Sequence, residues 1–158
     1  MVEIKVTDNT NGYVEAARLN PGDTGSAARA WCTYNAGPTP ENGDVLSHTA
    51  MGHATLSVAN RTGQLAVVKL RSAAGAVVAS VFLDPGGETT VDALPDDPVQ
   101  LDFATGEVWS RACHSFAAGM RAQRLPGLVS IGNDMQLDIP PDPKAKPVDL
   151  SDQAFAQE

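Results

Sequence analysis

Charged and aromatic side chains are scarce in this sequence, and the scarcity excludes several kinds of protein. Only 19% of the 158 residues are charged and 5% are aromatic, and 19 acidic residues against 11 basic ones give a net charge of −8. A negative field repels phosphate backbones, so we expect no nucleic-acid partner. No apolar run approaches the roughly 18 residues that cross a bilayer, so we expect no membrane insertion.

The sequence also lacks a targeting segment and a cysteine motif. Its start, MVEIKVTDNTNG, has no charged region followed by an apolar stretch, so an intracellular or virion-associated protein is the default expectation. The two cysteines, Cys32 and Cys113, form no CxxC pair, which excludes a zinc ribbon and a thioredoxin-type site. Two interpretations stay open for them: a disulfide that closes a long loop, or two reduced and partly buried thiols.

What the sequence does contain is a series of short apolar segments separated by turn residues. Residues 99–103 and 135–139 alternate between apolar and polar side chains, and residues 76–83 are apolar on both faces. Residues 65–70 form another expected strand, in which the side chains at 65, 67 and 69 oppose those at 66, 68 and 70. Six or seven such segments, with no room for crossover helices between them, predict an all-β fold. We expect a single antiparallel β-sandwich, immunoglobulin-like or transthyretin-like.

The composition divides the chain into three parts. Residues 1–53 hold a short strand at their start and are otherwise irregular and loop-rich, with one short helix expected near residues 26–32. Residues 54–140 form the predicted sandwich. Residues 141–158 are proline-rich and are expected to form an extended tail.

The central part resembles a family of small, poorly characterised bacterial and prophage-associated β domains. The resemblance lies in TGQLAVVKL, VASVFLDPGGETTVDALP and QLDFATGEVW, which follow the pattern VKL…G…F.v.pGg…P…L.fATG..W over about residues 54–140. The matching positions are Val68, Lys69, Leu70, Phe82, Gly86 or Gly87, Pro95, Leu101, Ala104, Thr105, Gly106 and Trp109. Two stretches depart from the pattern, PDDPVQLDF and residues 112–116. The resemblance implies a sandwich-type module without established catalytic residues.

Residue types that could support chemistry are few. Cys113 and His114 are adjacent, so in a strand their side chains point to opposite faces and cannot easily form a thiolate–imidazole pair. His48 and His53 are five residues apart and do not share a helix face. We therefore expect no catalytic residue, cofactor or metal. A small enzyme, or a ligand- or metal-binding protein that uses these four residues, is the alternative.

Partner contacts are the function we expect instead. Arg111, Arg121 and Arg124 concentrate positive charge in an acidic chain and suit an acidic partner, including a second copy. Trp31, Tyr34 and Phe155 supply large rings near the two ends of the chain. The sequence predicts a non-catalytic structural or interaction subunit of an envelope-accessory or virion-decoration type. Its two arms would dock onto a protein partner or form a homo-oligomer, and removing residues 141–158 would weaken assembly without harming the fold.

Overall fold

The computed structural model describes residues 2–5, 11–14 and 24–158, with side chains from residue 27 onward. The strands are β1 (Val2–Lys5), β2 (Asn11–Val14), β3 (Val45–His48), β4 (Ala54–Asn60), β5 (Leu65–Arg71), β6 (Val77–Leu83), β7 (Glu88–Leu94), β8 (Gln100–Gly106), β9 (Trp109–Ser110), β10 (Ser115–Phe116), β11 (Arg121–Arg124), β12 (Met135–Ile139) and β13 (Val148–Leu150). The helices are α1 (Thr24–Tyr34), α2 (Asp152–Ala156) and a 3-10 turn at Pro143–Ala145. The prediction of a mostly β protein is confirmed.

Two sheets carry most of the described chain. The larger has the strand order β13-β11-β8-β5-β6-β3, with every pair antiparallel. The smaller has the order β12-β4-β7. Here β4 and β7 are antiparallel, but β12 runs parallel to β4. The expectation that all strands are antiparallel is therefore wrong for β12. Separately from these sheets, β1 pairs with β2 and β9 pairs with β10.

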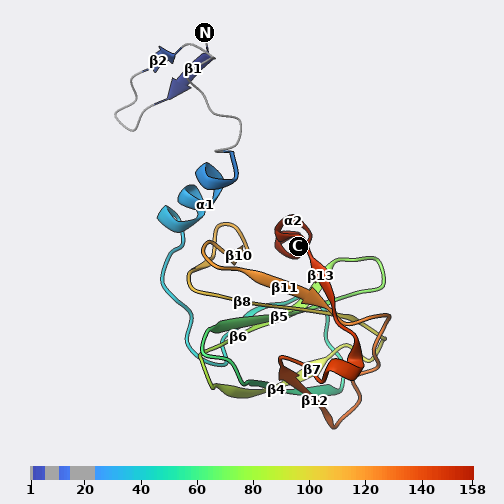
Figure 1. Cartoon of the computed structure of the whole chain (residues 1–158). Helices are drawn as coiled ribbons and strands as arrows, with labels where there is room; N and C mark the ends of the chain where they lie inside the picture. Colours follow the sequence, from blue (N-terminus) through green and yellow to red (C-terminus); the bar gives the residue numbers. More distant parts are fainter. Residues whose placement is uncertain (1, 6–10, 15–23) are drawn as a thin grey trace.

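Apolar side chains fill the space between the two sheets, which lie one above the other in Figure 1. The smaller sheet contributes Leu56 and Val91, and the larger contributes Val68 and Leu101, all of them buried. At about 25 cal/mol per Å² of apolar surface, this layer supplies most of the folding free energy. All seven residues of β6 are buried, as expected for a strand that is apolar on both faces.

A second apolar cluster lies on the other face of the larger sheet. Val67 and Phe82 of the sheet pack there with Trp109 and Phe116, whose rings meet edge to face at 5.1 Å. Phe155 of α2 completes this cluster with no exposed surface. The helix therefore covers the face that would otherwise expose these rings.

The predicted N-terminal arm is only in part an arm. Residues 36–53 pack on the sheets: β3 pairs with β6, and the backbone N–H of Gly52 donates to Ala93. Backbone contacts with the sheets begin at Ala36, which accepts a hydrogen bond from Arg111. The boundary expected at residue 54 therefore falls within a folded region. We call residues 36–158 the body.

The prediction that residues 141–158 form an extended tail is wrong for most of this stretch. Within residues 148–158, the C-terminal segment, β13 pairs with β11 and α2 lies against the larger sheet (Figure 1). Lys144 donates its backbone N–H to Asp142 in the turn that leads into this segment. The 3-10 turn at Pro143–Ala145, which lies between β12 and β13, contains no buried side chain. None of the described helices is long and apolar enough to span a membrane.

Candidate interaction site

Helix α1 carries the most exposed aromatic side chains among the described residues. Alanines at 27, 28 and 30 favour the helix, and Gly37, with a φ of +74°, lies just beyond its end. The side chain of Trp31 is 58% exposed and that of Tyr34 is 88% exposed. Residues three apart lie on one side of a helix, so these two rings form one surface. Between Ala27 and Tyr34 the helix has one charged residue, Arg29.

A disulfide between Cys32 and Cys113 connects α1 to the loop between β9 and β10. This settles the choice that the sequence left open between a disulfide and two free thiols. Neither core cluster contains any of the α1 side chains described from Ala27 onward. The described attachments of the helix to the body are this covalent bond and its contacts with β9.

Arg111 fixes the chain where it leaves α1. Its backbone N–H donates to Ala36, and its Nε donates to the carbonyl oxygen of Pro38 at 2.7 Å. The Arg111 side chain also lies against Gly37. The guanidinium of Arg111 thus already binds the backbone of its own chain, and its expected role as a partner contact stays a prediction.

Arg124 is likewise an internal residue. Its Nε donates to Oδ1 of Asp102 at 2.7 Å and its Nη2 to Oδ2 at 3.0 Å. Oδ2 also accepts from Nε of Arg71 at 2.7 Å, and Asp102 has no exposed surface. The Asp102 carboxylate raises the pKa of Arg124 through these hydrogen bonds. Of the three arginines of the expected patch, Arg121 alone lies exposed at the start of β11 without a described internal acceptor.

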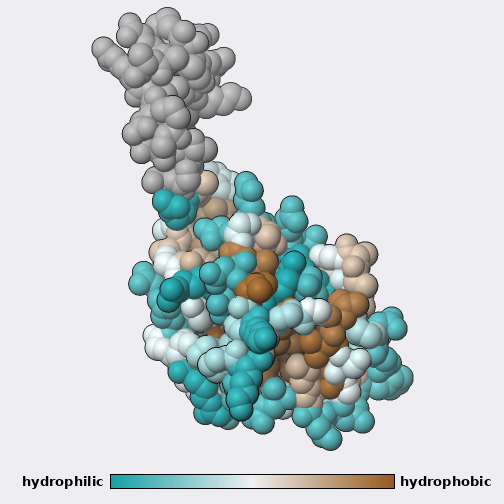
Figure 2. All heavy atoms as spheres, turned by 45° about the vertical axis from the view of Figure 1, so that its right-hand side comes forward, coloured by the Kyte–Doolittle hydropathy of each residue, from teal (hydrophilic) through white to brown (hydrophobic). Residues whose placement is uncertain are grey.

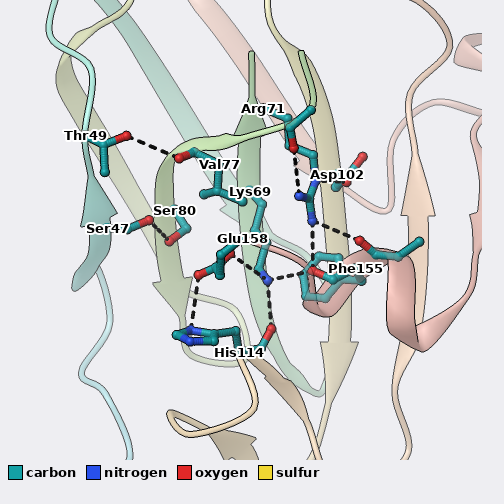
Figure 3. A network of polar contacts seen from close by, with 12 residues as sticks. Ser47, Thr49, Lys69, Arg71, Val77, Ser80, Asp102, His114, Phe155 and Glu158 are labelled. Carbon is teal, nitrogen blue, oxygen red and sulfur yellow. Dashed lines mark hydrogen bonds and ion pairs between the residues drawn. The ribbon is translucent and has the colours of Figure 1, made fainter. Parts of the chain in front are cut away.

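Phe155 is also corrected from a partner contact to a core residue. Its ring lies 4.5 Å from Nζ of Lys69, a cation–π distance, and its carbonyl oxygen accepts from Lys69 at 2.6 Å and from Arg71 Nη2 at 2.9 Å. Arg71 also donates to the carbonyl of Ala154, and Figure 3 shows Lys69 and Arg71 beside Phe155. Two buried cations thus bind carbonyl groups near the end of α2, where the helix leaves them without partners.

Lys69 is the most unusual group of this network because its side chain is only 1% exposed. Its Nζ donates to the carbonyls of His114 and Phe155 and lies 3.3 Å from Glu158 Oε2. Burial lowers the pKa of Lys69 to about 8, and the nearby carboxylate of Glu158 offsets part of that effect. Figure 3 shows Glu158 between Lys69 and His114, whose Nδ1 lies 3.1 Å from Oε1. The network fixes the C-terminal segment in place.

The residues of the alternative function lie in separate environments. The sulfur of Cys113 is bonded to Cys32, so it is not a thiolate nucleophile in this form. His48 Nε2 contacts the carbonyl of Ala93, and His53 Nδ1 contacts Asp96 at 3.1 Å. Hydrogen bonds from His53, first from its backbone N–H, lower the pKa of Asp96. Within the described ranges, no three such side chains gather as a metal site.

Comparison with family models, curated proteins and solved structures found no match to this chain. The resemblance of residues 54–140 to the bacterial and prophage-associated domains therefore stays a prediction.

The buried network of Lys69, Arg71 and Asp102 was not identified from the sequence. The available signal was two cations, two residues apart, in the otherwise apolar segment VVKLR, which places them on one face of a strand. A buried face with cations needs acceptors from elsewhere in the chain. The sequence does not show that residues more than 80 positions away supply them.

Proposed function

We propose that this protein is a non-catalytic interaction subunit that docks onto a partner protein through helix α1. The observation that carries the proposal is the exposure of Trp31 and Tyr34 on one side of a helix attached to the body by a disulfide. Large aromatic rings dominate the energetics of both protein cores and protein interfaces. Two exposed rings on one side of a helix therefore favour an interface.

The composition of the helix favours a partner with an apolar docking surface. From Ala27 to Tyr34 the helix has one charged residue, and its other side chains are mostly apolar. Apolar surface that leaves water at an interface favours association. A second copy of the chain presents the same helix, so self-association is measured first.

Other exposed apolar side chains support docking less well. Met51, Leu128 and Val148 are each more than half exposed, but none of them is aromatic. Figure 2 shows a largely hydrophilic face on which hydrophobic residues gather in separate patches. Scattered apolar residues are normal on protein surfaces. Leu128 therefore serves as the control position for Trp31.

Two further features belong to this proposal. The two-layer arrangement with a shared apolar core supports a β-sandwich, immunoglobulin-like or transthyretin-like, as the scaffold. The disulfide favours a location in an oxidising compartment, such as a cell envelope or the surface of a virion. An envelope-accessory or virion-decoration subunit combines these properties.

The test is a binding measurement with matched variants. The chain is purified under native conditions, its self-association is measured by sedimentation, and any stoichiometric protein partner is identified and purified separately. Trp31→Ala should then weaken the measured association at least about tenfold, whereas Leu128→Ala should leave it unchanged. Equal affinities for the two variants would contradict docking through α1, as would a monomer that binds no protein.

The enzymatic alternative has its own test. An enzyme that uses Cys113 needs its thiolate, and the thiolate forms only after reduction of the disulfide. Any activity found in the native preparation should therefore be insensitive to Cys113→Ser if the interaction proposal holds. An activity that requires both a reductant and Cys113 would favour the alternative.

A further inference from the structure

The surface that carries Trp31 and Tyr34 depends on a bond that a cell can break. Cys32 lies between these two residues in α1, and Cys113 lies in the loop between β9 and β10. Both cysteines are half-buried and lie outside the two core clusters, so we expect a dithiol reductant to reach the bond. The disulfide can therefore control the order of α1 as well as attach it to the body.

Without this bond, few described contacts keep α1 helical. The helix has 11 residues, and isolated helices shorter than about 12–15 residues are marginal in water. None of the α1 side chains described from Ala27 onward belongs to a core cluster, and Arg111 binds the chain only from Ala36 onward. The side-chain hydrogen bonds of Thr33 and Asn35 are local, to carbonyls within the same helix.

The other partner of the disulfide has independent support. The backbone N–H of Cys113 donates to Oγ of Ser110, and the neighbouring His114 carbonyl accepts from Lys69 at 2.7 Å. Ser115 and Phe116 pair with β9. Breaking the disulfide thus leaves the loop of Cys113 held by the body, whereas α1 loses its covalent attachment and keeps only its contacts with β9.

We infer that the Cys32–Cys113 disulfide is a redox switch that orders α1 and thereby builds the docking surface. A thiolate of the reductant attacks one sulfur, the Cys32–Cys113 bond breaks, and a mixed disulfide forms. The second thiol of the reductant then displaces the protein sulfur. Two electrons and two protons pass to the protein, which ends with two thiols, while the dithiol becomes a disulfide. The oxidised chain presents a preformed helix, and the reduced chain presents an unfolded arm.

The role of the switch in docking rests on the proposed function, but the order of α1 can be measured without a partner. Trypsin cleaves after Arg29, which lies inside the helix, and cleavage requires the helix to open locally. The full chain is digested with and without dithiothreitol, and the rate of cleavage between Arg29 and Ala30 is followed by mass spectrometry. Reduction should raise this rate at least about tenfold.

A double variant separates loss of the bond from other effects of the reductant. Cys32→Ser with Cys113→Ser should be cleaved rapidly in both conditions. Amide exchange in β5 and β6 reports on the body and should change little on reduction. An unchanged cleavage rate after Arg29 would overturn the inference, and so would loss of protection in β5 and β6, which would make the bond a stabiliser of the body.

The two proposals fail in different ways. If Trp31→Ala binds normally while reduction still exposes Arg29 to trypsin, the docking assignment is wrong and the redox switch stands. If Trp31→Ala abolishes binding but reduction leaves the cleavage rate unchanged, docking through α1 stands and the switch is wrong.

Discussion

The two ends of the described chain each carry a short helix with aromatic side chains, but they are attached in opposite ways. Helix α1 exposes Trp31 and Tyr34 and is joined to the body by one disulfide. Helix α2 buries Phe155 completely and is held by hydrogen bonds from Lys69 and Arg71. The first helix leaves its two rings exposed, and the second is part of the core.

This difference shows that an aromatic residue near a chain end does not by itself identify a docking arm. What distinguishes the ends is what the body offers to each. At the C-terminal segment the body provides an apolar cluster and two buried cations that need acceptors. For α1 the described residues provide a cysteine and little apolar surface. Variants at the two helices and in the buried network test this difference in attachment.

Deleting residues 148–158 should abolish the cooperative fold, contrary to the expectation from the sequence. The deletion removes β13 and Phe155, and it leaves Lys69 and Arg71 without their carbonyl acceptors. We expect a loss of about 5 kcal/mol or more, comparable to the whole stability of a small domain. Urea unfolding followed by circular dichroism measures it, with deletion of Glu158 alone as the milder control. A truncated chain that unfolds at the wild-type urea concentration would place the segment outside the fold.

Asp102→Asn should destabilise the chain by about 3–5 kcal/mol, because one partner of a buried ion pair is removed. The carboxylate accepts from Arg71 and from Arg124, and an amide leaves both guanidinium groups without a counter-charge. Asp96→Asn, at an exposed contact with His53, is the control and should lower the unfolding free energy far less than Asp102→Asn does. Similar losses for the two variants would show that the buried network is not a special source of stability.

Phe155→Ala should cost about 3–5 kcal/mol, and Tyr34→Ala should cost less than about 0.5 kcal/mol. Phe155 has no exposed surface, whereas the side chain of Tyr34 is 88% exposed. Thermal unfolding of the two variants beside the wild type compares the two ends directly. A large effect of Tyr34→Ala would mean that α1 contributes to the core.

The pH dependence of stability should carry a contribution from Lys69. Its pKa is about 8 in the folded chain and 10.5 in its ordinary state, so between these values the unfolded chain binds more protons. Stability from this group therefore rises as the pH increases from 8 to 10.5, by up to about 3 kcal/mol.

Lys69→Met keeps the length of the side chain and removes the titration. The difference in unfolding free energy between this variant and the wild type, measured by urea unfolding from pH 7 to 10, should shift in favour of the wild type as the pH rises. A difference that does not vary with pH would contradict a lowered pKa for Lys69.

The sequence predicted the strands whose own side chains determine their burial. Alternation of apolar and polar residues located β8 and β12, and largely apolar segments located β5 and β6. By contrast, β11 reads RAQR and β13 has three residues, so neither has a recognisable pattern. Their places in the sheet follow from pairing with each other and with β8, which is long-range information.

The same limit applies to the candidate site. Trp31 and Tyr34 were named from the sequence, and the structure leaves both exposed. The arginines and Phe155 looked alike as candidates, because the sequence does not reveal the carbonyl of Pro38 beside Arg111 or the burial of Asp102 beside Arg124. Whether an exposed-looking residue already has a partner within its own chain depends on contacts between distant segments.

Hydrogen exchange on the full chain, read at α1 and α2 in the same sample before and after reduction, tests the contrast most directly. The amide of Asn35 donates to Trp31 in α1, and the amide of Phe155 donates to Ser151 in α2. After reduction, the amide of Asn35 should exchange at the rate of an unfolded peptide, whereas the amide of Phe155 should stay protected. Unchanged protection of Asn35, or equal loss of protection at both amides, would contradict it.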